Sequence, residues 1–347
     1  MQEYINTIKY SVNFTDKNWD SNAYKMILKN GFVVIKGVFQ EEEREKLMNT
    51  FVKQLKKINK DIDKNDKENS PPMTKDGLYK LIVGNLPIVW KIRTHKNIRK
   101  IFERVYSQLN NEKITDFVSS IDGVNFRPPY NYKKTNEWAH LDQTVDGIFK
   151  CIQGQVVLNT STAAFKVTPK SHFLYNQIIN MMEIKNKNSN WLMIPKNSYT
   201  DIKNMLKNKD EFQIPIYTEG GSVILWSSST IHSAQTHVGE LKDFFPENTF
   251  DKNNKYLNWR SIIYICYRPK KDVDDSHCDN LQMVYRNNFT TNHWGDKINK
   301  GFNRFFNKTK FSKEMEELIN NPDRIYSMKG LNPKLTKEVK LLLGMKL

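Results

Sequence analysis

The stretch Trp138-Ala-His-Leu-Asp-Gln-Thr144 places an imidazole and a carboxylate two residues apart, at His140 and Asp142. In a β-strand, residues i and i+2 point to the same face, so these two side chains could hold one metal ion together. A second histidine far downstream, at the end of another strand, would complete a facial triad of two histidines and one carboxylate. Such a triad leaves positions open on iron for a cosubstrate and O₂. His-x-Asp alone is common by chance, so the prediction depends on the elements that would position it.

The segment from Lys150 to Asn159 has one apolar face and one polar face. The polar face carries three side-chain amides, at Gln153, Gln155 and Asn159. Buried amides cost free energy unless they find hydrogen-bond partners, so a strand of this kind suits the inner wall of a small-molecule site. A strand with one solvent-exposed face would show the same alternation, and that alternative stays open.

Other elements must bring these residues together. The apolar pattern predicts a helix over residues 19–29 with a C-cap at Gly31, a buried strand over 32–37 and a charged helix over 40–58. Strands are also expected near 165–172, 220–226 and 260–267, and a helix over 335–345. His172 is interpreted as structural, and His95, His277 and His293 as surface or loop residues, with Cys278 in the same loop as His277.

Composition limits the class of protein. Of the 347 residues, 38% are hydrophobic and 12% aromatic, which is enough for a globular core. Only 3 cysteines occur, without a Cys-x-x-Cys pair, which argues against a disulfide framework and for an intracellular, reducing compartment. No signal peptide is recognisable, and no apolar run reaches the ~20 residues of a membrane span. The net charge of +16 favours anionic partners, nucleic acid among them, although the lysines are scattered.

Several short motifs follow one another in a characteristic order. They are Gly31-Phe-Val-Val-Ile-Lys-Gly37, His140-x-Asp142, Pro169-Lys-Ser-His172, Gly221-Ser-Val-Ile-Leu-Trp226, His232 and Arg260. In order and spacing they resemble the phytanoyl-CoA dioxygenase family over roughly residues 20–270. The resemblance implies an α+β, β-rich protein built on a double-stranded β-helix, a jelly-roll or cupin-like fold, with flanking helices and inserted loops. It also implies an oxygenase that depends on Fe(II) and 2-oxoglutarate and consumes O₂.

By position, the resemblance implies that His140, Asp142 and His232 bind the iron. Arg260 would pair its guanidinium with the distal carboxylate of 2-oxoglutarate, a planar two-donor match that lysine imitates poorly. Gln155 stands where the family often has an aromatic residue beside the cosubstrate, and its amide would have to hydrogen-bond instead.

Three further residues are candidates for the same roles. Asn125, on the predicted strand that precedes the metal motif, is a weaker candidate for holding 2-oxoglutarate. His237 is the alternative to His232 as a metal ligand. Arg268, farther along the same face of the predicted strand, is the alternative to Arg260.

The chain departs from the family pattern in places. Lys170 stands where the family usually has the glycine of Pro-Gly-Ser-His, and another glycine is missing near Ala164. The stretch from His232 to Arg260 is longer than usual, and an inserted loop is the simplest explanation. These departures leave room for a catalytically inactive β-helix that acts as a binding or structural protein. A third interpretation is a cupin-type metal protein that does not use 2-oxoglutarate.

The substrate is not specified by any motif. The retained Asp142 favours hydroxylation, because related halogenases replace this carboxylate with a small residue to admit chloride. The basic loop around Lys133 and Lys134, together with the net charge of +16, makes an anionic substrate a reasonable hypothesis. It would be a phosphorylated or CoA-linked small molecule, or a base in nucleic acid, on which aromatic residues such as Trp138 could stack.

The predicted organisation is one oxygenase domain over residues 1–295, with N-terminal helices and insertions at 59–78, 173–215 and 235–258. Residues 296–347 are expected to form a basic, helical C-terminal extension, which lies outside the resemblance.

Overall fold

The computed structural model describes residues 7–58, 62–63, 78–79, 83–129, 138–184, 190–251, 253–299 and 333–346. Its contacts divide the chain into two compact units, Met1–Phe39 with Pro129–Arg260, and Gln40–Pro128 with Ser261–Leu347. The predicted basic loop at Lys133 and Lys134 lies outside the described residues, as do most of the 59–78 insertion and of the C-terminal extension. The domain boundaries drawn from the sequence stay a prediction.

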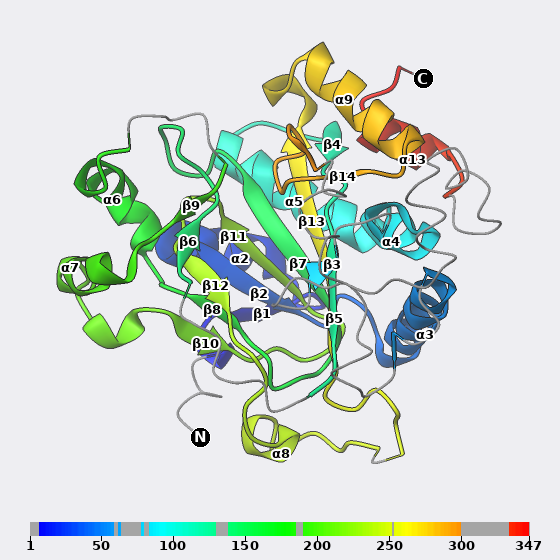
Figure 1. Ribbon diagram of the computed structural model, residues 1–347, viewed down its shortest axis with the longest axis horizontal. Helices are drawn as coiled ribbons and strands as arrows, with labels where there is room; N and C mark the ends of the chain where they lie inside the picture. The colour runs from blue at the N-terminus through cyan, green and yellow to red at the C-terminus, as the bar shows by residue number, and fades with distance from the viewer. Residues whose placement is uncertain are drawn as a thin grey trace, which may run out of the picture. The chain divides into compact units, whose positions relative to one another are not determined.

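The first unit contains two β-sheets (Figure 1). In the first sheet, strands lie side by side in the order β1 (Ser11–Asn13), β2 (Phe32–Lys36), β11 (Val223–Ser227) and β7 (Ile152–Asn159). β1 runs parallel to β2, and the other two pairs are antiparallel. Helix α2 (Trp19–Asn30) packs against β2 and β11 through a buried stripe at Trp19, Ala23 and Ile27, as its period of 3.6 residues predicts.

The second sheet of this unit is antiparallel throughout. Its order is β10 (Ile214–Ile216), β8 (Phe165–Val167), β12 (His232–Ala234), β6 (His140–Leu141) and β9 (Leu192–Met193). The two sheets face each other, since the ring of Phe165 lies 4.9 Å from that of Trp226 and 6.5 Å from that of Phe32. The predicted α+β, β-rich, jelly-roll-like architecture is confirmed, although the described strands do not close into a barrel.

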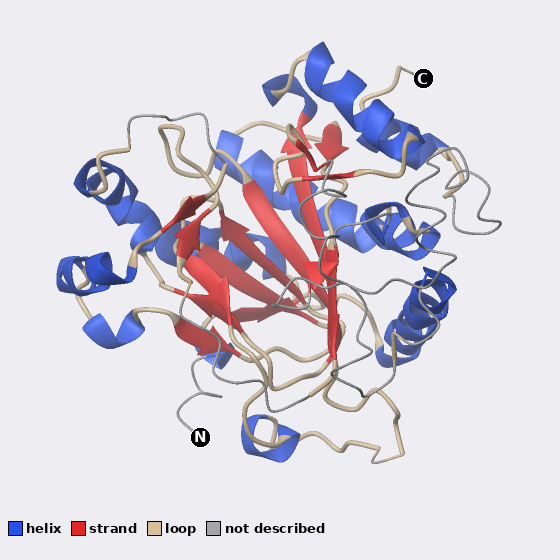
Figure 2. Ribbon diagram, in the orientation of Figure 1, coloured by secondary structure: helices blue, strands red, loops and turns tan. Residues whose placement is uncertain are grey.

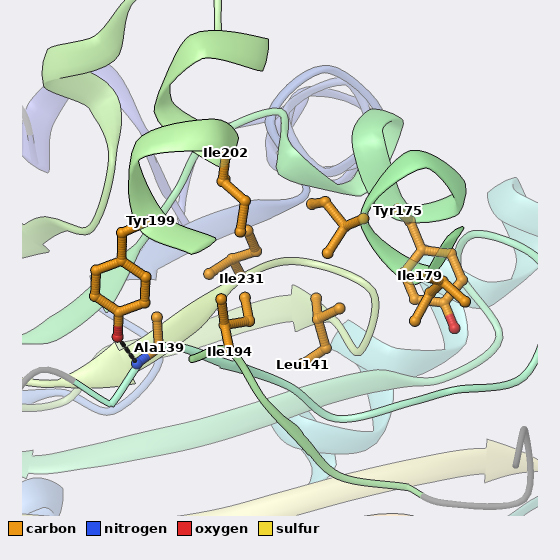
Figure 3. Packing of buried hydrophobic residues seen from close by; sticks show 9 residues of the cluster. Ala139, Leu141, Tyr175, Ile179, Ile194, Tyr199, Ile202 and Ile231 are labelled. Atoms are coloured by element: carbon orange, nitrogen blue, oxygen red, sulfur yellow. Dashed lines mark hydrogen bonds between the residues drawn. The ribbon is translucent and has the colours of Figure 1, made fainter. Parts of the chain in front are cut away.

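Helices α6 (Tyr175–Met181) and α7 (Tyr199–Met205) lie over the outer face of the second sheet, as Figure 2 shows in blue beside the red strands. Figure 3 shows Leu141 and Ile231 packed in the apolar cluster beneath these helices. The Tyr199 hydroxyl accepts a hydrogen bond of 3.0 Å from the backbone N–H of Ala139. Successive side chains of a strand point to opposite faces, so His140 and His232 are turned inward, between the sheets.

The second unit is mostly helical. Among the described residues of this unit, the helices are α3 (Glu41–Ile58), α4 (Pro87–Arg93), α5 (Lys96–Asn110), α9 (Asp275–Arg286) and α13 (Lys337–Leu342). Strands β13 (Arg260–Pro269), β5 (Val124–Arg127) and β3 (Leu78–Tyr79) pair in that order, and β4 (Phe117–Ser119) also pairs with β13. The first residue of β13, Arg260, belongs to the first unit. The other described elements are α8 (Leu241–Phe244) in the first unit, β14 (Thr290–Thr291) and β15 (Ile298–Asn299) in the second unit, and short single-turn helices.

The prediction of a loop at His277 and Cys278 is wrong. Both residues are buried in α9. The helix begins at Asp275 because the Asp274 carboxylate accepts a hydrogen bond of 2.8 Å from the His277 backbone N–H, which caps its first turn. Burial lowers the pKa of His277 to about 4, so this imidazole is neutral rather than a charged surface group.

Gly31 joins α2 to β2 and confirms the predicted C-cap. Its φ of 81° lies in the left-handed region, and its N–H donates to the carbonyl of Ile27 at 2.8 Å. Its own carbonyl accepts hydrogen bonds from the Ser227 N–H at 2.9 Å and the Thr230 hydroxyl at 3.1 Å. The turn therefore ties the start of β2 to the segment that leads to His232.

We expect Gly31→Ala to lower the free energy of unfolding by about 3 kcal/mol. A Cβ at this position would overlap the Thr230 hydroxyl and lie 2.6 Å from His172 Nδ1, in addition to the backbone strain. Gly37→Ala is the matched control, because φ is 67° there but a Cβ meets nothing within 4 Å. Its expected cost is only about 1 kcal/mol. Urea unfolding measures both, and equal losses would contradict the steric argument.

His172 is a structural residue, as predicted. It is fully buried, and its Nε2–H donates to the carbonyl of Leu28 at 3.1 Å. Burial lowers its pKa from 6.5 to about 4, which keeps the folded imidazole neutral. At pH values between about 4 and 6.5, His172 binds a proton in the unfolded chain but not in the folded chain. The protein therefore loses stability as the pH falls through this range.

We expect acidification from pH 7 to pH 4 to lower the free energy of unfolding by about 3 kcal/mol through His172 alone. His172→Gln retains a donor for the Leu28 carbonyl but cannot titrate, so its stability should fall less over the same range. Urea unfolding of both proteins at several pH values measures the difference. The same loss in wild type and variant would show that this imidazole does not set the acid sensitivity.

Among the described residues, no helix combines the length and the apolar character that crossing a membrane requires.

Candidate metal centre

His140, Asp142 and His232 come together between the two sheets. One ligand atom from each lies within 4.8 Å of the others, and all three residues are buried. His140 Nε2 is 3.6 Å from one carboxylate oxygen of Asp142, and His232 Nε2 is 3.2 Å from the other. The register explains the meeting, because His232 of β12 pairs directly with His140 of β6. Strand alternation then brings Asp142 near the face that carries both imidazoles.

Both imidazoles are held in one tautomer by their own backbone. His140 Nδ1 lies 3.2 Å from the carbonyl oxygen of Trp138, and His232 Nδ1 lies 2.9 Å from that of Thr230. A carbonyl oxygen only accepts, so in each ring Nδ1 carries a proton, and Nε2 is the ring nitrogen that faces Asp142. Metal-bound histidines are usually oriented by a hydrogen bond of this kind from the other ring nitrogen.

A turn of four hydroxyl residues, Ser227 to Thr230, fixes the carboxylate and one histidine. The Ser228 carbonyl accepts a hydrogen bond of 3.0 Å from the Asp142 N–H, and its hydroxyl donates to Gln143 Oε1 at 2.6 Å. Gln143 Nε2 in turn donates to the carbonyl of Gly147 at 2.7 Å. Sequence reasoning missed these positioning residues, whose only signal was a run of hydroxyls directly before His232.

Aromatic rings enclose the group. The indole of Trp138 stacks on His140 with centroids 4.7 Å apart and planes at 9°, while Trp226 lies 5.3 Å from the ring of His232. Trp191, directly before edge strand β9, is 48% exposed, and its ring lies 6.2 Å from that of His140. Met193, directly opposite His140 in the register, is also exposed. The site is therefore apolar around its polar centre, with exposed apolar side chains at one edge.

Arg260 is buried at the start of β13, near the second sheet. Its Nη1 donates to the carbonyl of Ala163 at 3.2 Å, and its Nε has no hydrogen-bond partner among the described residues. The segment before it is anchored by Asn159, whose amide donates to the carbonyls of Tyr256 at 2.7 Å and Trp259 at 3.0 Å. One of the three amides noted in the sequence thus holds the backbone that carries Arg260.

The other candidates occupy different surroundings. Gln155 is buried on β7 opposite Ile224 of β11, within the first unit. Asn125 is buried on β5, opposite Leu78 of β3, in the second unit. Arg268 donates to the carbonyl of Asp272 at 3.0 Å and lies over the ring of Trp294, so its guanidinium already has partners in the second unit. His237 lies beyond β12 and outside the group of three ligands.

The sequence pattern grouped Gln153 with two other amides of the strand and gave it no role of its own, but its surroundings in the structure set it apart. It is 1% exposed, and neither its amide nitrogen nor its amide oxygen has a hydrogen-bond partner among the described residues. It pairs with Trp226 across β7 and β11, so its side chain points to the same face as the indole that contacts His232. An unsatisfied buried amide on this face suits hydrogen bonds to a ligand, because leaving both atoms unpaired is costly.

We expect Gln153→Leu to raise the free energy of unfolding of the ligand-free protein by about 1 kcal/mol, since it removes two unsatisfied polar atoms at nearly constant volume. Gln153→Leu should also weaken the binding of a ligand at the metal centre, because the leucine side chain cannot make the hydrogen bonds of the amide. Urea unfolding with and without ligand measures both effects. A destabilised Gln153→Leu protein would show that the amide is already satisfied in the ligand-free state.

No protein-family model matches the chain, and no curated protein is similar to it in sequence. Two solved structures of the hypothetical protein JW0805 from Escherichia coli have TM-scores of 0.56 and 0.54 at 10% and 12% identity, over 97% of this chain and 85% of theirs. A structure of the epimerase SnoN in complex with Fe³⁺, alpha ketoglutarate and nogalamycin RO has a TM-score of 0.44 at 12% identity, over 74% of this chain and 85% of its own. EctD from S. alaskensis with bound Fe has a TM-score of 0.46 at 12% identity, over 76% of this chain and 81% of its own.

At such low identity the likeness to JW0805 shows the fold alone. What the fold and the site define is an α+β, β-rich protein with two facing sheets and a buried cluster of two histidines and one aspartate that could hold a metal ion. The resemblance to the phytanoyl-CoA dioxygenase family stays a prediction.

Proposed function

We propose that the chain is an Fe(II)- and 2-oxoglutarate-dependent dioxygenase that hydroxylates its substrate. The observation that carries the proposal is the buried group of His140, Asp142 and His232, with ligand atoms within 4.8 Å of one another. Two imidazoles and one carboxylate on one face are the ligand set of non-haem Fe(II) oxygenases, which leaves the opposite face for cosubstrate and O₂.

The residues present fit a ferrous ion. Each imidazole has its Nδ1 engaged by a backbone carbonyl and its Nε2 directed toward Asp142, which is the arrangement that ligation requires. The close approach of two histidines to one buried carboxylate is also what a divalent cation between them would stabilise. The ligands come from two strands and the loop after β6, so the fold rather than local flexibility sets their positions.

Arg260 is proposed to bind the distal carboxylate of 2-oxoglutarate. Its guanidinium is buried, its Nη1 donates to the Ala163 carbonyl and its Nε has no partner among the described residues, so a carboxylate would offset the cost of burying its charge. Gln155, in the same unit as the metal ligands, is proposed as a further contact to the cosubstrate. The Gln153 amide, unsatisfied beside Trp226, would supply an additional donor and acceptor to ligands at the site.

Iron and 2-oxoglutarate together would supply the oxidising power that places one atom of O₂ in a substrate C–H bond and the other in succinate, with release of CO₂. The chain would hold the metal through His140 Nε2, His232 Nε2 and the Asp142 carboxylate. These groups are kept in orientation by the hydrogen bond from the Asp142 N–H to the Ser228 carbonyl and by the hydrogen bonds from the two Nδ1 atoms to backbone carbonyls. Trp226 and Phe165 keep bulk water from the inner side of His232. Because Asp142 occupies the third protein position, hydroxylation is favoured over halogenation.

We propose an anionic small molecule as the substrate. The net charge of +16 would draw an anion to the protein, and the stacked pair of Trp138 and His140 offers an aromatic surface beside the metal ligands. Exposed Trp191, directly before β9, and exposed Met193 on β9 favour a substrate with an apolar part. A base in single-stranded nucleic acid is the less favoured alternative, because stacking surfaces accept many other ligands.

Anaerobic titration of 2-oxoglutarate into the Fe(II)-loaded protein tests the proposal. We expect the weak visible charge-transfer band of 2-oxoglutarate bound to Fe(II), and slow succinate formation once O₂ is admitted. Iron binding without the band would indicate a cupin-type protein that does not use 2-oxoglutarate. Failure to bind iron at all would indicate an inactive β-helix that acts as a binding or structural protein.

A further inference from the structure

The second unit contains a hollow with a volume of about 930 Å³, lined by three segments: one side of α4 from Pro87 to Thr94, the first turns of α5, and residues 333–339. None of its lining residues belongs to the first unit, which carries the metal ligands. Five of the lining residues are cationic: Lys91, Lys96, Arg99, Lys100 and Lys334. We propose that this basic hollow binds a small molecule that joins an apolar group to more than one phosphate.

The cations in the basic hollow are placed to meet an anion. Lys91, Lys96, Lys100 and Lys334 are exposed, and Arg99 has 28% of its side chain exposed. Lys96, Arg99 and Lys100 share one face of α5, and Lys91 and Lys334 reach the same space from two other segments. The first turn of the fifteen-residue helix α5 adds the partial positive charge of its N-terminus at Lys96.

Only two lining residues are acidic, against five cationic ones. Glu103 lies 3.7 Å from Arg99 within α5, as an i,i+4 pair. Glu338 lies in the first turn of α13, where a carboxylate is stabilised by the N-terminal end of the helix. The surplus of cations favours a ligand with several negative charges.

The size and the apolar lining narrow the ligand class. Small-molecule sites have volumes of roughly 300–1,000 Å³, so the hollow suits a nucleotide-sized ligand and is far larger than a single phosphate needs. Pro87, Pro333 and Val339 supply apolar contact area beside the cations. A nucleic-acid surface would instead be an extended basic stripe, and here carboxylates interrupt the basic residues.

Calorimetric titration of the full-length protein with ATP, adenosine and inorganic phosphate at about 150 mM salt tests the proposal. We expect saturable one-to-one binding of ATP, with adenosine and phosphate each at least about tenfold weaker. The double variant Lys96→Glu/Lys100→Glu should weaken ATP binding at least about tenfold. Glutamates in the first turns of α5 suit the helix end, so the variant should fold, which thermal unfolding can check.

The matched control is Lys53→Glu/Lys57→Glu on α3, which changes the net charge equally at exposed positions outside the hollow. It should leave the dissociation constant for ATP within about twofold of wild type. Absence of saturable ATP binding, or equal losses in both double variants, would overturn the proposal. Tighter binding of a single-stranded oligonucleotide than of ATP, lost in the α5 variant, would overturn it in favour of nucleic acid. Neither result bears on iron binding by the first unit.

Discussion

His232→Ala is expected to weaken Fe(II) binding by roughly 100-fold or more and to abolish succinate formation. The variant removes one of the two imidazoles whose Nε2 atoms face the Asp142 carboxylate, at 3.2 Å in the case of His232. With only two protein ligands left, the ion would lose both affinity and the geometry that places cosubstrate and O₂ side by side. Equilibrium dialysis with Fe(II) under anaerobic conditions measures the affinity, and succinate release measures the reaction.

His237→Ala is the matched control for this prediction. It removes the same side chain five positions farther along, from a residue that lies outside the group of three ligands. Its Fe(II) affinity should stay within about twofold of wild type. If His237→Ala loses iron and His232→Ala does not, the alternative ligand considered from the sequence is the correct one, and the ligand assignment here is wrong.

Arg260→Ala is expected to raise the dissociation constant for 2-oxoglutarate by roughly 100-fold while leaving Fe(II) affinity nearly unchanged. The guanidinium would make two charge-assisted hydrogen bonds to the distal carboxylate, and both would be lost. Arg260→Lys keeps the charge but not the planar pair of donors. Its affinity for 2-oxoglutarate should therefore lie between those of the wild type and Arg260→Ala. Anaerobic titration of the Fe(II)-loaded variants, followed by the visible band, gives each dissociation constant.

Arg268→Ala separates this assignment from its alternative. The Arg268 guanidinium already donates to the Asp272 carbonyl and lies 5.1 Å from the ring of Trp294, so its removal should not change the affinity for 2-oxoglutarate. A large loss in Arg268→Ala with normal affinity in Arg260→Ala would reverse the two roles.

Local patterns were enough to predict the elements that carry the site. The C-cap at Gly31, the buried strand that follows it and the alternation in β7 are all readable from neighbouring residues, because helix and strand periods are local. His140-x-Asp142 also suggested one shared face. What the sequence could not supply is the direct pairing of His232 with His140, since strand register depends on contacts between distant segments.

Lys170 shows that a turn for which a glycine was expected forms without one. Its φ is 66°, so the backbone takes the left-handed conformation that glycine adopts most easily, at a cost of about 1 kcal/mol. The turn is held by its surroundings: the Lys170 N–H donates to the Asn30 carbonyl at 2.9 Å, and its side chain lies 3.7 Å from Glu211. A sequence comparison records the substitution but not these compensating contacts.

The amides of β7 show that a strand's alternation does not tell which of its polar side chains is available to a ligand. The alternation marked Gln153, Gln155 and Asn159 as equivalent, yet they differ in the structure. Asn159 is fully used in anchoring Tyr256 and Trp259, whereas Gln153 has no hydrogen-bond partner among the described residues. Which amide can serve a ligand depends on the loop that packs against each one, and this loop lies about 100 residues away in the sequence.

Anomalous diffraction from crystals grown with Mn(II), in place of Fe(II), and 2-oxoglutarate tests the central claim most directly. The account predicts one strong metal peak bonded to His140 Nε2, His232 Nε2 and the Asp142 carboxylate, with the distal carboxylate of 2-oxoglutarate on the Arg260 guanidinium. A peak held by other residues, or 2-oxoglutarate bound away from Arg260, would contradict it.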